Sequence, residues 1–309
     1  MTSSDRTLAA AALILAYATV IGFTDNWVRV VAAEAGLWQF HATRSAMALA
    51  MIAGVAAAAG LRLRPNRPGA GLARSAIHAA AMLVYFGALA FLPVAQVAAG
   101  LFTAPIFVLL IGRLAFGHPL GPVRVAAVAV GFLGVVLVLG PEAMAGATLA
   151  ALLPVVAGAL YALGNIATRE WCEGESALVL TGGFFGILGL FGAIGLGVLA
   201  AFPLPVAEGA AGWVTRGPVV PSDGFWFWTI VQAAGSLVGV GMMVRAYQIA
   251  EAGRVAVFEY IILPASAFWG WVIWAEVLTP LAATGMVLIA LAGAMIALRA
   301  RQVPVAARQ

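Results

Sequence analysis

The chain is a succession of long apolar segments separated by short polar links. A helix that crosses the hydrocarbon core of a bilayer needs roughly 20 mostly apolar residues, and segments of that kind recur ten times. The links are too short to hold a soluble domain. The pattern therefore predicts an all-α integral membrane protein with ten transmembrane helices. The ten windows run over residues 8–30, 37–60, 72–92, 94–112, 120–140, 148–168, 177–202, 225–249, 254–275 and 279–299.

The second half of the chain repeats the first. Aligning the last three apolar segments of each half places Pro264 on Pro105, and aligning the first segment of each half places Asn165 on Asn26. The two alignments have different offsets along the chain. The difference matches the length of the polar stretch 203–223, which is therefore interpreted as an insertion in the second copy.

These alignments define the predicted domains. We predict a first five-helix repeat over residues 1–141, a second over 147–300 with an outer loop at 203–223, and a cytoplasmic tail at 301–309.

The two copies must have opposite orientations in the membrane, because each holds an odd number of spans. Inverted repeats that meet at a central site are typical of secondary transporters, which expose that site to each side of the membrane in turn. The sequence therefore predicts two inverted five-helix repeats around a central cavity, and transport by alternating access.

The composition excludes a soluble protein. Hydrophobic residues make up 64% of the 309 residues and charged residues only 9%, and the mean hydropathy is +1.06. A soluble domain of this size needs more charge to keep its surface solvated. The first apolar segment is too long, and lacks the flanking pattern, for a cleaved signal peptide. We therefore expect it to be kept as a span.

All 16 basic residues are arginine. Without lysine the sequence cannot form a Schiff base, which excludes a retinal protein and a pyridoxal enzyme. The single cysteine, Cys172, excludes an internal disulfide and a cysteine-based zinc site. The net charge of +4 comes from arginines at the ends of the spans and does not indicate nucleic-acid binding. We expect no cofactor, no metal and no nucleic-acid partner.

The arginines also predict the topology. Ten spans put both termini on one side, and if that side is the cytoplasm, thirteen arginines lie inside and three outside, as the positive-inside rule requires. Abundant Ala, Gly, Pro and Arg indicate a GC-rich bacterial genome. We therefore expect a multi-pass protein of a bacterial cytoplasmic (inner) membrane with both termini in the cytoplasm. The inside set is Arg6, Arg62, Arg64, Arg67, Arg74, Arg113, Arg124, Arg169, Arg245, Arg254, Arg299, Arg301 and Arg308, and the outside set is Arg29, Arg44 and Arg216.

Charged groups near the outer ends of the first two spans have structural interpretations. Asp25 and Arg29 are four residues apart, a spacing that lets the two side chains pair on one helical face. Such an interfacial pair explains Asp25 as well as a functional role does. Arg44 enters the second span from the outside, and we favour a role in holding helices together through backbone carbonyls or Asp25.

Polar and aromatic residues at helical spacing mark a candidate substrate site at mid-depth. The alignment that matches Pro264 with Pro105 also carries the face with Gln96 and Thr103 onto the face with Glu259, so both faces are expected to line one cavity. The two prolines lie mid-span, where each frees a backbone carbonyl and bends its helix. They are candidate hinges, with a packing kink as the alternative. The candidate substrate-binding residues are His78, Tyr85, Gln96, Thr103, Tyr161, Asn165, Gln232, Ser236, Glu259 and Tyr260.

Tryptophans gather toward the outer ends of the eighth and ninth spans. The simplest interpretation is an aromatic belt at the membrane interface. The alternative is that Trp269 or Tyr260 stacks on an aromatic substrate. The belt residues are Trp226, Trp228, Trp269, Trp271 and Trp274.

The sequence contains no enzyme motif. The three histidines, His41, His78 and His118, are far apart and lack the HExxH spacing of metalloproteases. GxSxG, P-loop and paired-carboxylate motifs are also missing. We therefore expect neither catalytic activity nor an ATP-driven pump.

Several motifs give the chain a resemblance to a known family. The second copy carries the mid-span Pro264 and then the segment Trp274–Pro280, and the first copy carries Gly22–Trp27 and Phe40–Arg44. Together with the two sets of five spans, these motifs resemble the EamA-type repeat of the drug/metabolite transporter superfamily. The first copy departs from the pattern, because it has Gly117 where the second copy has an acidic residue, Glu276.

The resemblance implies a basket of ten helices. The first, third, fourth, sixth, eighth and ninth spans would line a central cavity, and the last span of each repeat would pack outside. Glu276 would be a structural acid at a helix end. Within the superfamily, the chain length, the Tyr and Trp content and the outer loop most resemble the YddG-type aromatic amino-acid exporters.

The predicted function is export of small amphipathic metabolites, with aromatic or large apolar amino acids as the leading cargo. Glu259 would bind the cargo ammonium or carry a coupling proton, and apolar walls with a few polar groups suit a small ligand. Multidrug or cationic efflux and exchange of another metabolite are alternatives. Phosphate-sugar exchange ranks low, because the arginines lie at the span ends, and an enzyme or a channel ranks lower still. The expected partners are a small-molecule substrate and the lipid bilayer, with monomer and homodimer both open.

Overall fold

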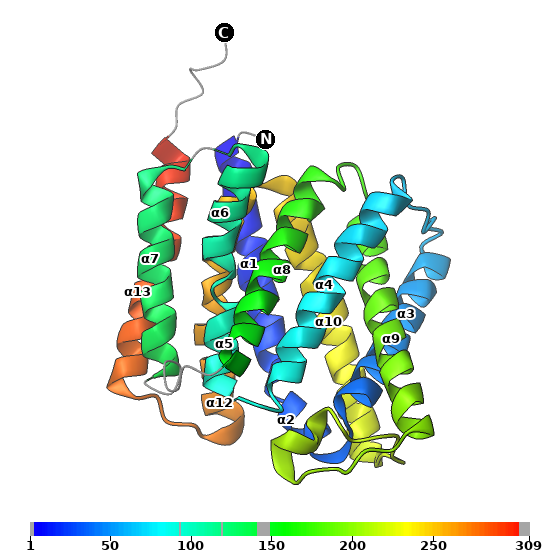
Figure 1. Ribbon diagram of the computed structural model, residues 1–309. Helices are drawn as coiled ribbons and strands as arrows, with labels where there is room; N and C mark the ends of the chain where they lie inside the picture. The colour runs from blue at the N-terminus through cyan, green and yellow to red at the C-terminus, as the bar shows by residue number, and fades with distance from the viewer. Residues whose placement is uncertain (1–2, 93, 119, 141–148, 303–309) are drawn as a thin grey trace.

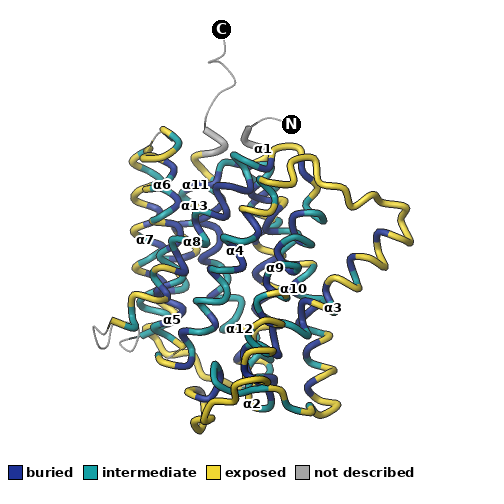
Figure 2. Tube along the Cα trace, turned by 45° about the vertical axis from the view of Figure 1, so that its right-hand side comes forward, coloured by how far each residue is buried: buried dark blue, intermediate teal, exposed yellow. Residues whose placement is uncertain are grey.

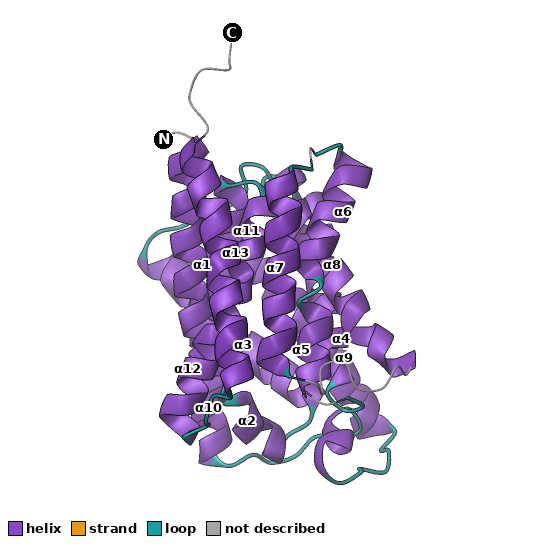
Figure 3. Ribbon diagram, turned by 90° about the vertical axis from the view of Figure 1, so that its left-hand side faces the viewer, coloured by secondary structure: helices purple, strands orange, loops and turns teal. Residues whose placement is uncertain are grey.

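The computed structural model describes residues 3–92, 94–118, 120–140 and 149–302, and this part of the chain consists of helices and loops without a strand (Figures 1 and 3). A bilayer requires such a fold, because a helix satisfies its own backbone hydrogen bonds where water is absent. The α-helices are α1 Ser3–Asp25, α2 Val28–Glu34, α3 Leu37–Ala58, α4 Pro68–Ala88, α5 Val94–Leu101, α6 Ala104–Phe116, α7 Pro122–Leu139, α8 Leu152–Glu170, α9 Ala177–Ala201, α10 Asp223–Ile249, α11 Ala252–Phe258, α12 Ile262–Trp274 and α13 Pro280–Gln302. Short 3-10 helices are η2 Leu149–Ala151, η3 Gly209–Trp213 and η4 Glu259–Ile261.

The predicted all-α membrane fold is confirmed. Nine segments of the described chain are long and apolar enough to cross a membrane. The tenth predicted span is α4, a helix of 21 residues that is not among the nine and carries Arg74, Ser75 and His78. It packs against α8 and α9 (Figure 1). The link 141–148 and residues 303–309 of the predicted tail lie outside the described residues, as do the side chains of Arg301 and Arg308.

Two of the spans are broken near the middle. The first breaks between α5 and α6, at Phe102 and Thr103, and the second breaks at η4, between α11 and α12. Pro105 and Pro264 each lie in the first turn of the helix that follows the break. Proline is tolerated in a first turn, because the backbone N–H that it lacks has no helical partner there. The predicted bends are therefore present.

The second halves of the broken spans end in the same way. α6 ends at Gly117 with φ 67°, and α12 ends at Ala275 with φ 54°, so both residues are in the left-handed conformation that closes many helices. Outside glycine this conformation costs about 1 kcal/mol. The alignment of the two halves pairs Ala275 with Phe116, the direct neighbour of Gly117. This correspondence supports the predicted repeats, whose boundaries stay a prediction.

The last spans of the two predicted repeats, α7 and α13, lie side by side at one edge of the bundle (Figure 1). Two glycines allow their backbones to approach closely. A Cβ added to Gly134 would lie 2.7 Å from the Gly285 carbonyl oxygen, and a Cβ added to Gly285 would lie 2.5 Å from that of Gly134. Close approach through small residues is the usual basis of helix pairing in membranes.

The two ends of the bundle differ in construction. α1 begins and α13 ends at one end, called here the terminal end, and α2 lies at the other, called the loop end (Figure 1). The predicted outer loop 203–223 folds over the loop end, where Trp38 donates to the Val214 carbonyl at 2.8 Å and Trp213 donates to that of Phe86 at 3.1 Å. The arginine-rich link 59–67, by contrast, is exposed throughout (Figure 2).

We predict that Gly134→Ala destabilises the protein by about 1–3 kcal/mol, because the new methyl group overpacks the contact between α7 and α13. The measurement is the thermal unfolding midpoint in detergent. Gly54→Ala is the matched control, since a Cβ at Gly54 in α3 would meet nothing within 4 Å. Equal midpoints for the two variants would contradict the proposed close packing.

Candidate functional site

A cavity of about 140 Å³ lies inside the bundle. Its walls come from the helices expected from the sequence, α1, α4, α8, α10 and the two broken spans, and also from α3 and α9. The lining residues are Tyr17, Ile21, Asp25, Arg44, Arg74, His78, Met82, Tyr85, Phe86, Leu101, Phe102, Ala104, Pro105, Tyr161, Phe184, Ser236, Val240, Met243, Glu259 and Ile262.

Glu259 is held at the wall of this cavity by two tyrosines. One carboxylate oxygen accepts from the Tyr161 hydroxyl at 2.8 Å, and the other accepts from the Tyr247 hydroxyl at 2.9 Å. The side chain is only 5% exposed. Glu259 belongs to the 3-10 turn η4, so the break in the helix brings its carboxylate between α8 and α10. The two hydrogen bonds compensate a polar group that would otherwise be costly to bury.

His78 and Asn165 form a second polar pair. His78 Nε2 lies 2.9 Å from Asn165 Oδ1, and the imidazole packs edge-on against the Tyr161 ring at 5.3 Å between centroids. Because Asn165 Oδ1 accepts, Nε2 donates. His78 lines the cavity, whereas Asn165 lies behind it and fixes the orientation of the imidazole.

Asp25 lines the cavity toward the loop end. Gln232 Nε2 donates to the Thr24 carbonyl at 2.7 Å and to Asp25 Oδ1 at 3.2 Å, and Ser236 donates to Gln232 Oε1 at 3.2 Å. Gln232 therefore positions Asp25 from behind the wall, while Ser236 reaches the cavity itself.

The predicted pair between Asp25 and Arg29 is wrong. α1 ends at Asp25 and the chain turns before α2, so the spacing of four residues no longer places the two side chains on one helical face. Arg29 instead donates to Glu276 at 2.9 Å, and both side chains are half exposed. The interpretation of Glu276 as a structural acid agrees with this contact.

Arg44 and Arg74 both line the cavity. Arg74 is fully buried and donates to Thr168 Oγ1 at 2.8 Å and to the Leu180 carbonyl at 3.3 Å. Arg74 is therefore not a surface arginine, because its face of α4 packs against α8 and α9. The guanidinium of Arg44 lies over the rings of Phe40, at 4.8 Å, and Phe86, at 5.7 Å. The argument against anionic cargo assumed that the arginines lie at the span ends, and that assumption does not hold.

The cavity brings together six of the twelve residues singled out from the sequence and leaves six outside it. Tyr260 is fully buried, and its ring packs on Gly131 of α7 and near Phe102. Thr103 donates to the Gly100 carbonyl at 2.6 Å. The helix breaks explain both differences, since a regular helix was assumed across them. The residues in the cavity wall are His78, Tyr85, Pro105, Tyr161, Ser236 and Glu259, and those outside are Gln96, Thr103, Asn165, Gln232, Tyr260 and Pro264.

The sequence interpretation missed several lining residues, above all Tyr17, Arg74 and Phe184. A charged residue within an apolar window is a signal for Arg74. Tyr17 and Phe184 carry no such signal, because aromatic residues face lipid, packing contacts and cavities alike.

The tryptophans lie outside the cavity. Trp27 stacks on Trp228 with 3.3 Å between ring centroids and lies 5.2 Å from Trp274. Trp226 and Trp271 are exposed, as residues of an interfacial belt would be. Neither Trp269 nor Tyr260 reaches the cavity, so the alternative of substrate stacking on these two rings has no support.

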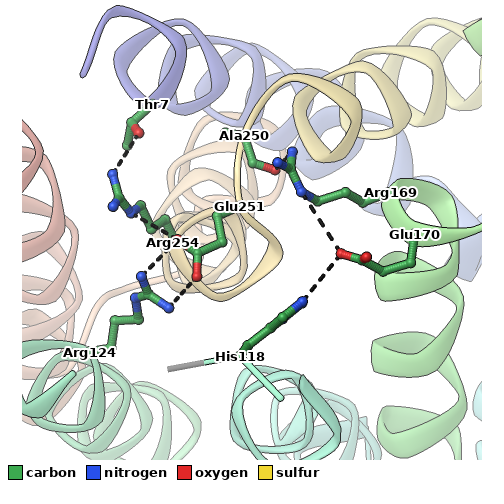
Figure 4. Close-up of polar contacts among 8 residues, drawn as sticks. All are labelled: Thr7, His118, Arg124, Arg169, Glu170, Ala250, Glu251 and Arg254. Atoms are coloured by element: carbon green, nitrogen blue, oxygen red, sulfur yellow. Dashed lines mark hydrogen bonds and ion pairs between the residues drawn. The ribbon is translucent and has the colours of Figure 1, made fainter. Parts of the chain in front are cut away.

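An ionic cluster joins three elements at the terminal end (Figure 4). Arg124 of α7 forms a two-bond contact with Glu251, with Nη2 at 2.7 Å from Oε2, and Nη1 bonded to Oε1. Arg254 of α11 lies 3.4 Å from the same carboxylate and donates to Thr7 of α1 at 3.3 Å. Paired hydrogen bonds between arginine and a carboxylate are among the stronger polar contacts.

A second chain of contacts lies beside the first (Figure 4). His118 Nε2 is 3.4 Å from Glu170 Oε1, and Arg169 Nε is 4.0 Å from the same oxygen. Arg169 also donates to the Ala250 carbonyl at 2.8 Å. These contacts tie the end of α8 to the links after α6 and α10, so the terminal end is closed by polar contacts between distant parts of the chain.

Cys172 lies directly after α8, next to these contacts, and is fully buried. Burial raises the pKa of its thiol above the ordinary value. The thiol therefore reacts slowly at neutral pH while the terminal end stays closed.

The chain is similar in sequence to several known transporters. Residues 8–140 match the EamA-like transporter family. The first half of the chain is an EamA-like transporter domain. The chain is 27% identical over 215 residues to a riboflavin transporter of Brucella anthropi, covering 69% of this chain and 70% of that protein.

Two further relatives and one solved structure are also similar to this chain. A riboflavin transporter of Rhizobium johnstonii is 28% identical, covering 68% of this chain and 63% of that protein. The pseudopaline exporter CntI of Pseudomonas aeruginosa is 26% identical, covering 72% of each. A crystal structure with a TM-score of 0.73 and 18% identity covers 97% of this chain and 100% of that one, and shows the same fold. The protein is thus a multi-pass membrane protein, as the sequence predicted, and its first half matches a transporter family.

We predict that Arg169→Ala increases the rate of Cys172 alkylation by about tenfold, because losing a hydrogen bond from a charged donor destabilises the closed terminal end. The measurement is maleimide labelling of the purified protein. Because the pKa of Cys172 is raised, the labelling rate should keep rising at pH values where that of an exposed thiol has levelled off. Arg113→Ala, at an exposed arginine near the end of α6, is the control. Labelling at the wild-type rate in Arg169→Ala would show that these contacts do not protect Cys172.

Proposed function

We propose that this protein is a secondary transporter that exports a small amphipathic metabolite through the cavity by alternating access. One observation supports this proposal above the others. The cavity combines aromatic and aliphatic walls with a few polar and charged groups, Asp25 and Arg44 toward the loop end and Glu259 near its middle. Binding sites for small ligands have this character.

Aromatic or large apolar amino acids are the first cargo to test. The apolar part of such a molecule would contact Tyr85 and Phe184, both of which line the cavity. Arg44 and Asp25 are the groups that suit a carboxylate and an ammonium. Both oxygens of Glu259 already accept tyrosine hydroxyls, so Glu259 is better suited to carrying a coupling proton than to binding the cargo directly.

A flavin-like cargo is the second candidate. Two of the relatives are named riboflavin transporters, and the aromatic wall of the cavity offers rings on which a planar heterocycle can stack. Efflux of cationic compounds has less support, because Arg44 and Arg74 add positive charge to the cavity wall.

The proposal also covers the hinges, the membrane and the orientation of the chain. Pro105 and Pro264 would act as hinges, since each begins the second half of a broken span beside the cavity. We place the protein in a bacterial cytoplasmic membrane, because its relatives are bacterial proteins. Both termini would lie in the cytoplasm. The terminal end described above would then face the cytoplasm.

The test is counterflow in proteoliposomes, with labelled Phe and Trp and, in a separate series, riboflavin. We predict exchange of at least one of these, and a loss of about tenfold or more in Glu259→Gln and in Tyr85→Ala, because each removes a group of the cavity wall. A pH gradient should alter the wild-type rate and leave Glu259→Gln unaffected if Glu259 carries the proton.

The controls are Glu208→Gln in the outer loop and Phe227→Ala, an exposed aromatic residue of α10. Both should transport like the wild type. Wild-type rates in Glu259→Gln and Tyr85→Ala would show that this cavity does not carry the cargo, whereas the absence of exchange for every compound would exclude these cargo classes.

A further inference from the structure

Two arginines in the cavity wall form no direct ion pair with another described residue, although Asp25 is close enough for its charge to act on Arg44. None of the ion pairs within 4.0 Å among the described residues involves Arg44 or Arg74. Arg44 is 5% exposed and Arg74 is fully buried. A buried charge without a direct ion pair is costly within a membrane bundle, and such residues mark functional sites by default.

Both guanidinium groups also have unused hydrogen-bond donors. Nε of Arg44 and Nη2 of Arg74 are buried and have no partner among the described residues. Buried polar atoms in proteins nearly always find a partner. Each arginine therefore has the positive charge and the free donor that an anionic group of a ligand requires.

The two arginines lie toward opposite ends of the same cavity. Arg44 lies over Phe86, which is twelve residues after Arg74 on α4 and so about 18 Å further along that helix. On α9, Arg74 bonds to the Leu180 carbonyl and Arg44 lies 6.0 Å from the ring of Phe185, five residues later, which is an axial distance of about 8 Å. The two positive groups are therefore on the order of 10 Å apart.

The wall between them is mainly apolar, but it also holds His78 and Glu259, and both oxygens of Glu259 are already bonded to tyrosine hydroxyls. Met82, Tyr85, Phe184 and Val240 line the cavity in this region. A ligand that satisfies both arginines needs an acidic group at each end and an apolar middle, and Asp25, beside the loop end, is placed to accept an amino group. We infer that the cargo of this cavity is an elongated diacid, with one carboxylate bound by Arg44 and the other by Arg74. This inference rests on the proposed transport function and narrows its cargo.

The experiment measures binding of α,ω-dicarboxylates to the purified full-length protein by calorimetry. The probes are succinate, adipate, suberate and sebacate, and each is compared with its half-amide, which has nearly the same shape but one charge fewer. We expect one chain length to bind best, and that diacid to bind about tenfold or more tightly than its half-amide. Equal binding of diacid and half-amide at every length, or no binding of any diacid, would overturn the inference.

Variants assign the two carboxylates. In Arg44→Gln and in Arg74→Gln, the advantage of the diacid over its half-amide should disappear, while the exposed Arg245→Gln on α10 should keep it. Arg74→Lys covers the case in which Arg74→Gln fails to fold, and it should reduce the advantage, because lysine lacks the planar fork of donors. An advantage that persists in both Arg44→Gln and Arg74→Lys would place the diacid elsewhere.

Failure of the diacid inference can be distinguished from failure of the proposed transport function. Counterflow of an amino acid or riboflavin without diacid binding would leave the proposed function standing and remove this inference. Diacid binding without counterflow of those compounds would support the diacid cargo and reject the cargo proposed first.

Discussion

A carboxylate buried in a membrane bundle must find its hydrogen-bond donors within the protein, and this constraint organises the centre of the molecule. Glu259 satisfies it by accepting from Tyr161 and Tyr247. One short side chain thereby joins α8, α10 and the broken span that contains η4. The Tyr161 ring also packs against His78, so α4 is held in register with the other three elements. The position of the cavity wall depends on these contacts more than on any apolar contact, because apolar packing has little directional preference.

The break at η4 allows Glu259 to reach its two tyrosine partners. In a continuous helix the last residues of α11 would direct the side chain at position 259 along a regular helical face, whereas the 3-10 turn changes that direction. Pro105 and Pro264 make such breaks inexpensive, since each takes a place where its missing N–H has no helical partner. Both broken spans also end in the left-handed conformation, at Gly117 and at Ala275.

Much of the fold could be predicted from the sequence, because the length and apolar character of the segments are imposed by the bilayer itself. The two prolines also predicted where the spans bend. The orientation of individual side chains could not be predicted across those bends. Tyr260 and Thr103 were assigned to the cavity by counting along regular helices, and the count fails at the breaks. The predicted contact between Asp25 and Arg29 is wrong for a similar reason, since the regular helix ends at Asp25.

Arg74 shows a different limit of sequence interpretation. Its place six residues into a helix that begins at Pro68 resembles that of an arginine at a membrane surface, and the topology rule counts it in that way. Only the packing of α8 and α9 around it shows that it is buried, with donors bonded to Thr168 and to the Leu180 carbonyl.

The two ends of the bundle resist opening through different interactions. The terminal end is joined by charged contacts between α7, α8, α11 and the neighbouring links. The loop end is covered by the segment 203–223, which is bonded through tryptophans and also through Gln39, Arg216 and the pair of Glu34 and Ser222. In an alternating-access cycle, opening the terminal end would separate several charges that are only partly exposed, whereas the half-exposed pair of Arg29 and Glu276 at the loop end contributes little, as surface ion pairs do. The conformation seen here is thus closed at both ends, by ion pairs at the terminal end and by hydrogen bonds of Gln39, Arg216 and Ser222 at the loop end.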